Sequence, residues 1–137
     1  MKIYNEQITL QSEKTREVFN ISTRVKAAME KSGFRDGIIL VSSLHPDCAV
    51  IVNEEAPGFL ESLENWLQEV APIGGNSRLA AAAESDAASR FQTLLLHHQV
   101  VVPFTENRLE LGAGQYVLFV ELRGVRPRRI VVKVMGE

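Results

Sequence analysis

Four polar residues stand at the two ends of one apolar run in the segment "SLHPDCAVIVNEE". His45 and Asp47 precede the run, and Asn53 and Glu54 follow it. A carboxylate beside an imidazole raises imidazole basicity and fixes its tautomer, so His45 and Asp47 could form a small acid–base pair. Glu54, if partly buried, would need a partner or a shifted pKa, which is typical of functional carboxylates. These four residues are therefore the first candidates for a site.

Structural roles could explain the same residues. Pro-Asp sequences form turns, and the sequence favours a turn in which Asp47 binds backbone N–H groups. Glu54 precedes a helix that begins at Pro57, where the helix macrodipole favours a carboxylate, and this alternative is as good as the catalytic one. Cys48 is the only cysteine and lies in the apolar run, so it is expected to be a small buried hydrophobe.

The apolar pattern predicts the elements that must position these residues. Helical spacing predicts one helix from Ser22 or Thr23 to about residue 31, ended by Gly33, and another from residue 57 to 70. A third helix is expected within 78–98, ending near His97, after a flexible loop at 73–79. Alternating or β-branched runs predict strands at 2–11, 17–22, 37–44, 48–53, 99–104, 108–111, 116–122 and 129–135.

The order of these elements indicates the fold class. The run at 17–22 is expected to pair with the run at 2–11 across a polar turn. Glu106-Asn107 fits a hairpin turn, and the glycines at 112 and 114 suggest a bend or bulge. The last four strands follow one another without a helix, which favours an antiparallel sheet and an α+β class.

Bulk composition narrows the classes of function. The chain of 137 residues is expected to form a single domain, 1–137, with 45% hydrophobic and 23% charged residues. Its formal charge of −2 gives no basic excess for nucleic acid. No apolar stretch approaches the roughly 20 residues that span a bilayer, and the N-terminus has no signal-peptide pattern. We therefore expect a cytoplasmic protein that binds neither nucleic acid nor membranes.

A cluster of arginines lies near the C-terminus. Arg126, Arg128 and Arg129 fall within four positions. Guanidinium groups bind phosphate in a bidentate manner, so the cluster could hold a phosphorylated ligand. More often such a cluster is a solvated hairpin or a set of intersubunit salt bridges.

Two long segments carry a resemblance: "SSLHPDCAVIVNEEAPGFLESLENWLQEVAP" and "LLLHHQVVVPFTENRLELGAGQYVLFVELRGVRPRRIVVKVMGE". They resemble the YjbQ-like family, which is commonly described as a secondary thiamine-phosphate synthase. The resemblance covers nearly all of residues 37–137, plus the helix that opens near Ser22. It implies an α+β fold with an antiparallel β-sandwich-like core and two or three helices. It also implies a homotrimer with a polar cavity near subunit contacts, where histidines hold a metal ion or an anion.

The resemblance assigns site positions residue by residue, and several of them are changed. Two threonines that follow the family's first histidine are Pro46 and Asp47 here, and an aspartate of the next helix is Ser62. A Tyr-x-His motif is absent, and Ser89 stands where another histidine is expected. Gly114 replaces a tryptophan. Matching positions are His45, Asn53, Glu54, Gln115 and Glu121.

These matches and losses predict a divergent YjbQ-like protein that keeps the trimeric scaffold, has weak or no catalysis, and binds a small phosphorylated or anionic ligand. The alternative is a transferase that joins a pyrimidine pyrophosphate to a thiazole phosphate. One imidazole with distant carboxylates makes no zinc site, so no metal ligand is predicted and no cofactor is identified. The catalytic candidates are His45 and Glu54, and the ligand-binding candidates are Asp47, Asn53, Gln115, Glu121 and Arg126. Glu121 is expected to pair with an arginine across the sheet.

Overall fold

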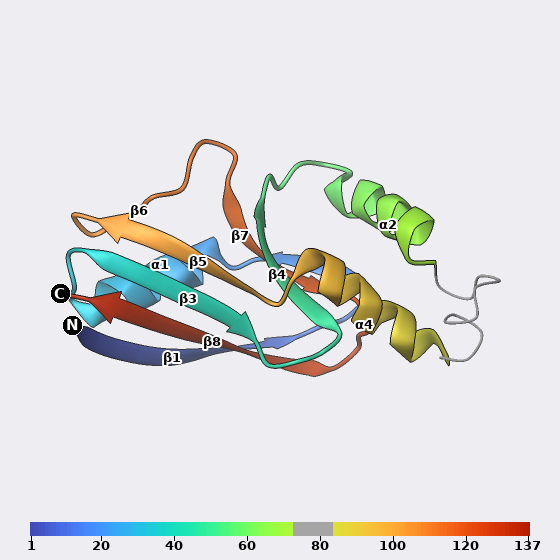
Figure 1. Cartoon of the computed structure of the whole chain (residues 1–137), viewed down its shortest axis with the longest axis horizontal. Coiled ribbons are helices and arrows are strands. Elements are labelled where there is room, and N and C mark those ends of the chain that lie inside the picture. Colours follow the sequence, from blue (N-terminus) through green and yellow to red (C-terminus); the bar gives the residue numbers. More distant parts are fainter. Residues whose placement is uncertain (73–83) are drawn as a thin grey trace.

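A computed structural model of the chain describes residues 1–72 and 84–137, so the loop predicted at 73–79 lies outside the described residues. The described residues form three helices and antiparallel strands (Figure 1), which confirms the α+β class. The helices are α1 (Ser22–Ser32), α2 (Phe59–Val70) and α4 (Glu84–Leu96). The strands are β1 (Lys2–Gln11), β2 (Glu17–Asn20), β3 (Gly37–Ser43), β4 (Cys48–Asn53), β5 (Gln99–Thr105), β6 (Arg108–Leu109), β7 (Tyr116–Glu121) and β8 (Pro127–Gly136).

The strands form two sheets. The larger has the order β1-β8-β3-β5-β6, and the smaller has the order β2-β7-β4. Every pairing is antiparallel. Figure 1 shows β8 and β3 side by side in the larger sheet, with β4 and β7 in a separate layer. The register that matters for the site is Cys48 opposite Glu121 at one end of β4 and Asn53 opposite Tyr116 at the other.

One predicted pairing is wrong, and the last four strands are divided between the two sheets. β2 pairs with β7 and not with β1, whose partner is the C-terminal strand β8. The last four strands do not form one sheet, because β7 lies in the smaller sheet while β5, β6 and β8 lie in the larger. Alternation reveals which side chains of a strand share a face, but it carries no information about which distant strand supplies the backbone partner.

The smaller sheet separates two cores. On β7, Val117 and Phe119 face the larger core between the sheets, which also takes the buried face of α1. Leu118 and Val120 face the opposite way, into a second core under α2 and α4 that includes Leu67. Successive residues of a strand point to opposite faces. Because both faces of β7 are covered, its residues must be apolar without alternation.

The helix ends follow the sequence signals in part. α1 ends at Gly33, whose φ of 74° is the left-handed conformation predicted there. Neither Ser22 nor Thr23 caps its start, since the cap position is Ile21 and the Ser22 hydroxyl instead accepts a hydrogen bond from the Val117 N–H at 2.8 Å. α2 begins two residues after the predicted Pro57, following Gly58 with a φ of 79°.

The turn at Glu106-Asn107 has the hairpin geometry that the sequence indicates, with φ values of 50° and 61°. In the larger sheet, position 37 has no room for a side chain. A Cβ on Gly37 would lie 2.0 Å from the Met135 carbonyl oxygen. None of the three helices described in residues 1–72 and 84–137 is long and apolar enough to cross a membrane.

Candidate functional site

The predicted site residues fall into two groups at opposite ends of β4. His45 and Asp47 precede the strand, and the register places Glu121 at the same end. Asn53 is the last residue of β4, Glu54 follows it, and Asn53 pairs with Tyr116, the residue after Gln115. Six strand residues separate the groups by roughly 20 Å at about 3.3 Å per residue. His45 and Glu54 of one chain therefore cannot act on the same small substrate.

At the first end, a buried guanidinium joins two carboxylates. Arg128 is 3% exposed, and its Nε and Nη2 donate to Glu121 Oε1 and Oε2, each at 2.7 Å. Its Nη1 lies 3.0 Å from Asp47 Oδ1, and Nη2 also donates to the Arg123 carbonyl at 3.1 Å. All three guanidinium nitrogens of Arg128 thus have partners within the chain, and a buried charge needs such partners.

Glu121 is fully buried yet remains charged. Burial alone would raise its pKa, but hydrogen bonds from Arg128, Ser12, Cys48 and the Arg123 N–H outweigh burial and hold the pKa below the usual range. The Cys48 thiol donates to Glu121 Oε2 at 3.2 Å. Burial, followed by the Glu121 charge, raises the pKa of Cys48, so the thiol is an inert donor.

This cluster decides several predictions. The pairing of Glu121 with an arginine is confirmed, and Cys48 is buried as expected. The favoured interpretation of Asp47 as a simple turn residue is incomplete, because its carboxylate forms an ion pair with Arg128. Within the arginine cluster, Arg128 fits neither alternative, because it is buried and paired with Asp47 and Glu121 of its own chain. Arg126 keeps an exposed side chain, while its backbone N–H and carbonyl bind the Ser12 hydroxyl.

His45 is anchored through one ring nitrogen. Its Nε2 accepts a hydrogen bond from the Arg129 backbone N–H at 2.9 Å, so Nε2 carries no proton and the neutral ring has its proton on Nδ1. Desolvation, followed by the positive charge of Arg128, lowers the pKa of His45. The charges of Asp47 and Glu121 oppose this shift without cancelling it. His45 is therefore a neutral N–H donor at neutral pH.

His45 lines an open pocket of about 480 Å³, here called the His45 pocket. It lies between the β3–β4 turn, α4 and the residue before β5. Two further basic side chains, Arg90 and His98, share its lining. None of the described side chains that line it is acidic. The lining residues are Ser43, Leu44, His45, Pro46, Arg90, Thr93, Leu94 and His98.

Sequence reasoning missed Arg90 and did not bring His98 into the site. Both residues are polar positions in or just after a helix whose place against β4 is set by tertiary packing. For Arg90, the sequence offers only one signal, which is that a charged residue in the predicted third helix should be exposed. Arg90 and His98 lie more than 40 positions from His45 in the chain, so their shared pocket is not visible in the sequence.

At the other end of β4, the polar residues are exposed and make local bonds. Asn53 Oδ1 accepts from the Glu54 N–H at 2.7 Å, and Gln115 Oε1 accepts from the Gly112 N–H at 2.8 Å. Gln115 is thus a turn residue. Glu54 is exposed, which removes the burial that its catalytic interpretation required. It also lies outside the first turn of α2, where Glu61 is the acidic residue.

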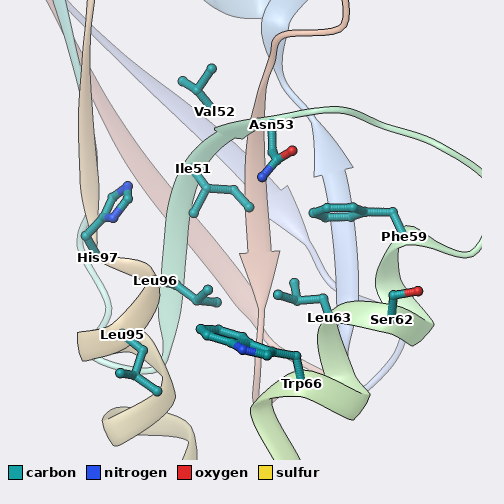
Figure 2. A pocket seen from close by; sticks show the side chains of 10 residues that line it. All are labelled: Ile51, Val52, Asn53, Phe59, Ser62, Leu63, Trp66, Leu95, Leu96 and His97. Atoms are coloured by element: carbon teal, nitrogen blue, oxygen red, sulfur yellow. The ribbon is translucent and has the colours of Figure 1, made fainter. Parts of the chain in front are cut away.

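Metal ligands do not converge in the described part of the chain. Within residues 1–72 and 84–137, no group of three or more His, Cys, Asp or Glu side chains is placed to hold a metal ion. Asn53 lines a second pocket, with side chains from α2 and α4 (Figure 2). The chemistry at the His45 end is thus hydrogen-bond donation and positive charge.

Comparisons with known proteins agree on one family. Residues 6–137 match the family model described as UPF0047 protein YjbQ-like. A UPF0047 protein of Methanothermobacter thermautotrophicus is 32% identical over 137 residues, covering 100% of this chain and 95% of the relative. A UPF0047 protein of Archaeoglobus fulgidus is 33% identical over 129 residues, covering 94% and 99%.

Solved structures show the same fold. A YbjQ-like protein of unknown function from Sulfolobus solfataricus P2 superposes with a TM-score of 0.92 at 27% identity, covering 99% of each chain. A hypothetical protein from Aeropyrum pernix K1 has a TM-score of 0.89 at 26% identity, covering 98% of this chain and 99% of the other. The family-model match over residues 6–137 and the relatives that are more than 30% identical over nearly the whole chain assign the protein: it belongs to the YjbQ-like UPF0047 family.

Proposed function

We propose that this protein binds a small anionic ligand, such as a phosphorylated metabolite, in the His45 pocket, and that it has weak or no catalytic activity. The observation that carries the proposal is the lining itself. Its described residues include Arg90, His45 and His98 and no carboxylate. An anion needs positive charge and N–H donors, and it is repelled by acidic side chains.

The donors available to the ligand are few and well defined. Ser43 Oγ donates to the His45 carbonyl and Thr93 Oγ1 donates to the Ser89 carbonyl, so neither hydroxyl proton is free. Arg90 is exposed and has no ion-pair partner among the side chains that the structure describes. Arg90 would supply the charge, and His45 Nδ1–H and His98 would supply directional donors.

Weak catalysis follows from the state of His45. A general base needs a free lone pair, and the lone pair of Nε2 is used by the Arg129 N–H. The lowered pKa of His45, caused first by desolvation, also makes its imidazolium a scarce acid at neutral pH. With no carboxylate in the lining to assist it, the pocket favours binding over proton transfer.

We also propose the homotrimer that the family resemblance implies, in a cytoplasmic setting that suits the single reduced thiol. Its support is exposed apolar surface beside the pocket. Leu94 is 77% exposed, and Leu44, Phe91, Leu95 and Val101 are also exposed. Exposed apolar patches of this kind mark interaction surfaces. Sedimentation equilibrium should give three times the chain mass, and a Leu94→Asp variant should give a smaller species.

The anion proposal is tested by titrating the ¹⁵N-labelled protein with inorganic phosphate and with pyrophosphate. Binding should shift the imidazole signals of His45 and His98, and Arg90→Met should weaken it about tenfold. Arg126→Met is the matched control, because Arg126 is also exposed but lies outside the lining. Equal weakening by both variants, or no shift of either imidazole, would count against the pocket.

The transferase alternative requires its own test. Departing pyrophosphate needs cations that stabilise it in the transition state. We expect no growth when the chain is expressed in a thiamine-requiring strain that lacks its main synthase, with soluble protein shown by immunoblot. Growth that depends on Arg90 would overturn the assignment of weak or no catalysis.

A further inference from the structure

We propose that a second pocket, between α2, α4 and β4, binds a neutral planar aromatic molecule that carries a hydrogen-bond acceptor. We call it the Trp66 pocket. Its volume is about 410 Å³, within the range of small-molecule sites. The proposal is independent of the anion site, since the two pockets have no lining residue in common.

Apolar side chains form the walls of the Trp66 pocket. Phe59, Leu63 and Trp66 come from α2 and face Leu96 of α4 across the groove (Figure 2). Trp66 is 46% exposed although it lies on a helix that packs against the second core. Figure 2 shows its ring reaching from α2 toward Leu96, where a planar ligand could stack on it. Aromatic stacking adds to the gain from burying apolar area.

Polar groups stand at one end of the same groove. The Asn53 carboxamide oxygen accepts the Glu54 N–H, which fixes the amide orientation and leaves Nδ2 as a donor. In Figure 2 this nitrogen is turned toward Ile51 and the oxygen is turned away. Nδ2 has no partner within the described ranges, so it can donate to a ligand. The Ser62 hydroxyl and the His97 ring line the same pocket.

The lining also determines the charge of the ligand. Among the described residues that line the Trp66 pocket there is no Lys, Arg, Asp or Glu, and His97 is the one titratable side chain. A charged molecule would lose hydration there without meeting a described guanidinium, ammonium or carboxylate group, and that loss is costly. A neutral ring gains from Trp66 and Phe59, and an acceptor on that ring can take the Asn53 Nδ2–H bond. The lining therefore favours a neutral ring over a phosphate or a carboxylate.

Coumarin is a suitable probe, because it is neutral, planar and carries only acceptors. Coumarin-3-carboxylate is its charged counterpart. Trp66 is the only tryptophan, so a ¹H–¹⁵N spectrum of the full chain contains one indole signal that reports on the pocket. We expect coumarin to shift this signal with half-saturation on the order of 1 mM, as for a fragment-sized ligand. The carboxylate should bind at least about fivefold more weakly.

Asn53→Asp keeps the acceptor for the Glu54 N–H and removes the Nδ2 donor. It should weaken coumarin binding about fivefold, while Asn5→Asp on β1 should leave binding unchanged. Thermal unfolding of each variant verifies the fold. The proposal is overturned if coumarin leaves the indole signal unmoved, if the carboxylate binds equally well, or if both aspartate variants behave alike. An indole signal that moves on dilution without ligand shows that a second copy fills the pocket, and this also overturns it.

Discussion

The Arg128 guanidinium and the Glu121 carboxylate meet in a two-pronged ion pair, with both N–O distances 2.7 Å. The two residues end β7 and begin β8, so the pair connects the two sheets where the chain crosses between them. Asp47 adds a second carboxylate from the turn before β4. The cluster therefore fixes three strands at the end of the molecule that also carries His45.

Removing Arg128 should strongly destabilise the protein. Arg128→Met leaves Glu121 and Asp47 buried without their cation, and breaking a buried pair costs about 3–5 kcal/mol. Urea unfolding at neutral pH measures the free energy of unfolding of each variant. Arg126→Met, a matched change at an exposed neighbour, should stay within about 0.5 kcal/mol of the parent. An equal loss of unfolding free energy in both variants would show that the buried ion pairs of Arg128 do not stabilise the fold.

Acid should weaken the fold through Glu121. Its folded pKa lies below the ordinary value of about 4.3, so only the unfolded chain takes up a proton as the pH falls below that value. The stabilisation is fully present above this range and is lost as the pH drops toward the folded pKa. Glu121→Gln lacks this titration, so its deficit in unfolding free energy should shrink between about pH 5 and pH 3. A constant deficit over that range would contradict the assignment.

His45 should give a second pH dependence at higher pH. Its pKa is lowered in the fold, first by desolvation and then by Arg128, so the unfolded chain binds a proton below about pH 6.5 while the folded chain does not. Stability should therefore fall as the pH drops through 6.5 toward the folded pKa. His45→Gln can still accept the Arg129 N–H and should flatten this part of the curve. NMR titration of the His45 Cε1–H signal gives the folded pKa directly, and a value above 6.5 would refute the argument.

Metal removal should leave the protein unchanged. Metal ligation through Nε2 of His45 would require breaking its bond with the Arg129 N–H. Dialysis against EDTA should leave the unfolding temperature unaltered, and elemental analysis should find zinc at well below one ion per chain. Stoichiometric zinc that disappears in His45→Gln would show that the ring turns and ligates a metal.

The sequence predicts the elements well because their signals are local. Alternation and β-branched runs place β3 and β4 nearly at their observed limits, and Gly33 ends α1 as expected. Strand pairing is not local, and β2 was therefore assigned to the wrong partner. Its four residues carry no signal for either sheet, and in the fold they pair with β7, where the Phe19 ring lies 6.3 Å from that of Phe119.

The candidate site was predicted less completely for the same physical reason. The sequence indicates the segment that contains His45 and Asp47. It does not separate Arg128, the partner of Asp47, from the exposed arginines beside it, because charge alone does not reveal burial. Glu54 was coupled to His45 because both flank one strand, yet an extended strand holds its ends far apart. Arg90 joins His45 only through the docking of α4 on β4.

The position of β7 has a consequence for how the molecule opens. It is the central strand of the smaller sheet, and apolar layers cover both of its faces. A local opening that leaves both cores intact cannot expose the backbone amides of β7. Hydrogen exchange of these amides should therefore require global unfolding. We therefore expect the amides of β7 to be among the slowest to exchange in the described part of the chain.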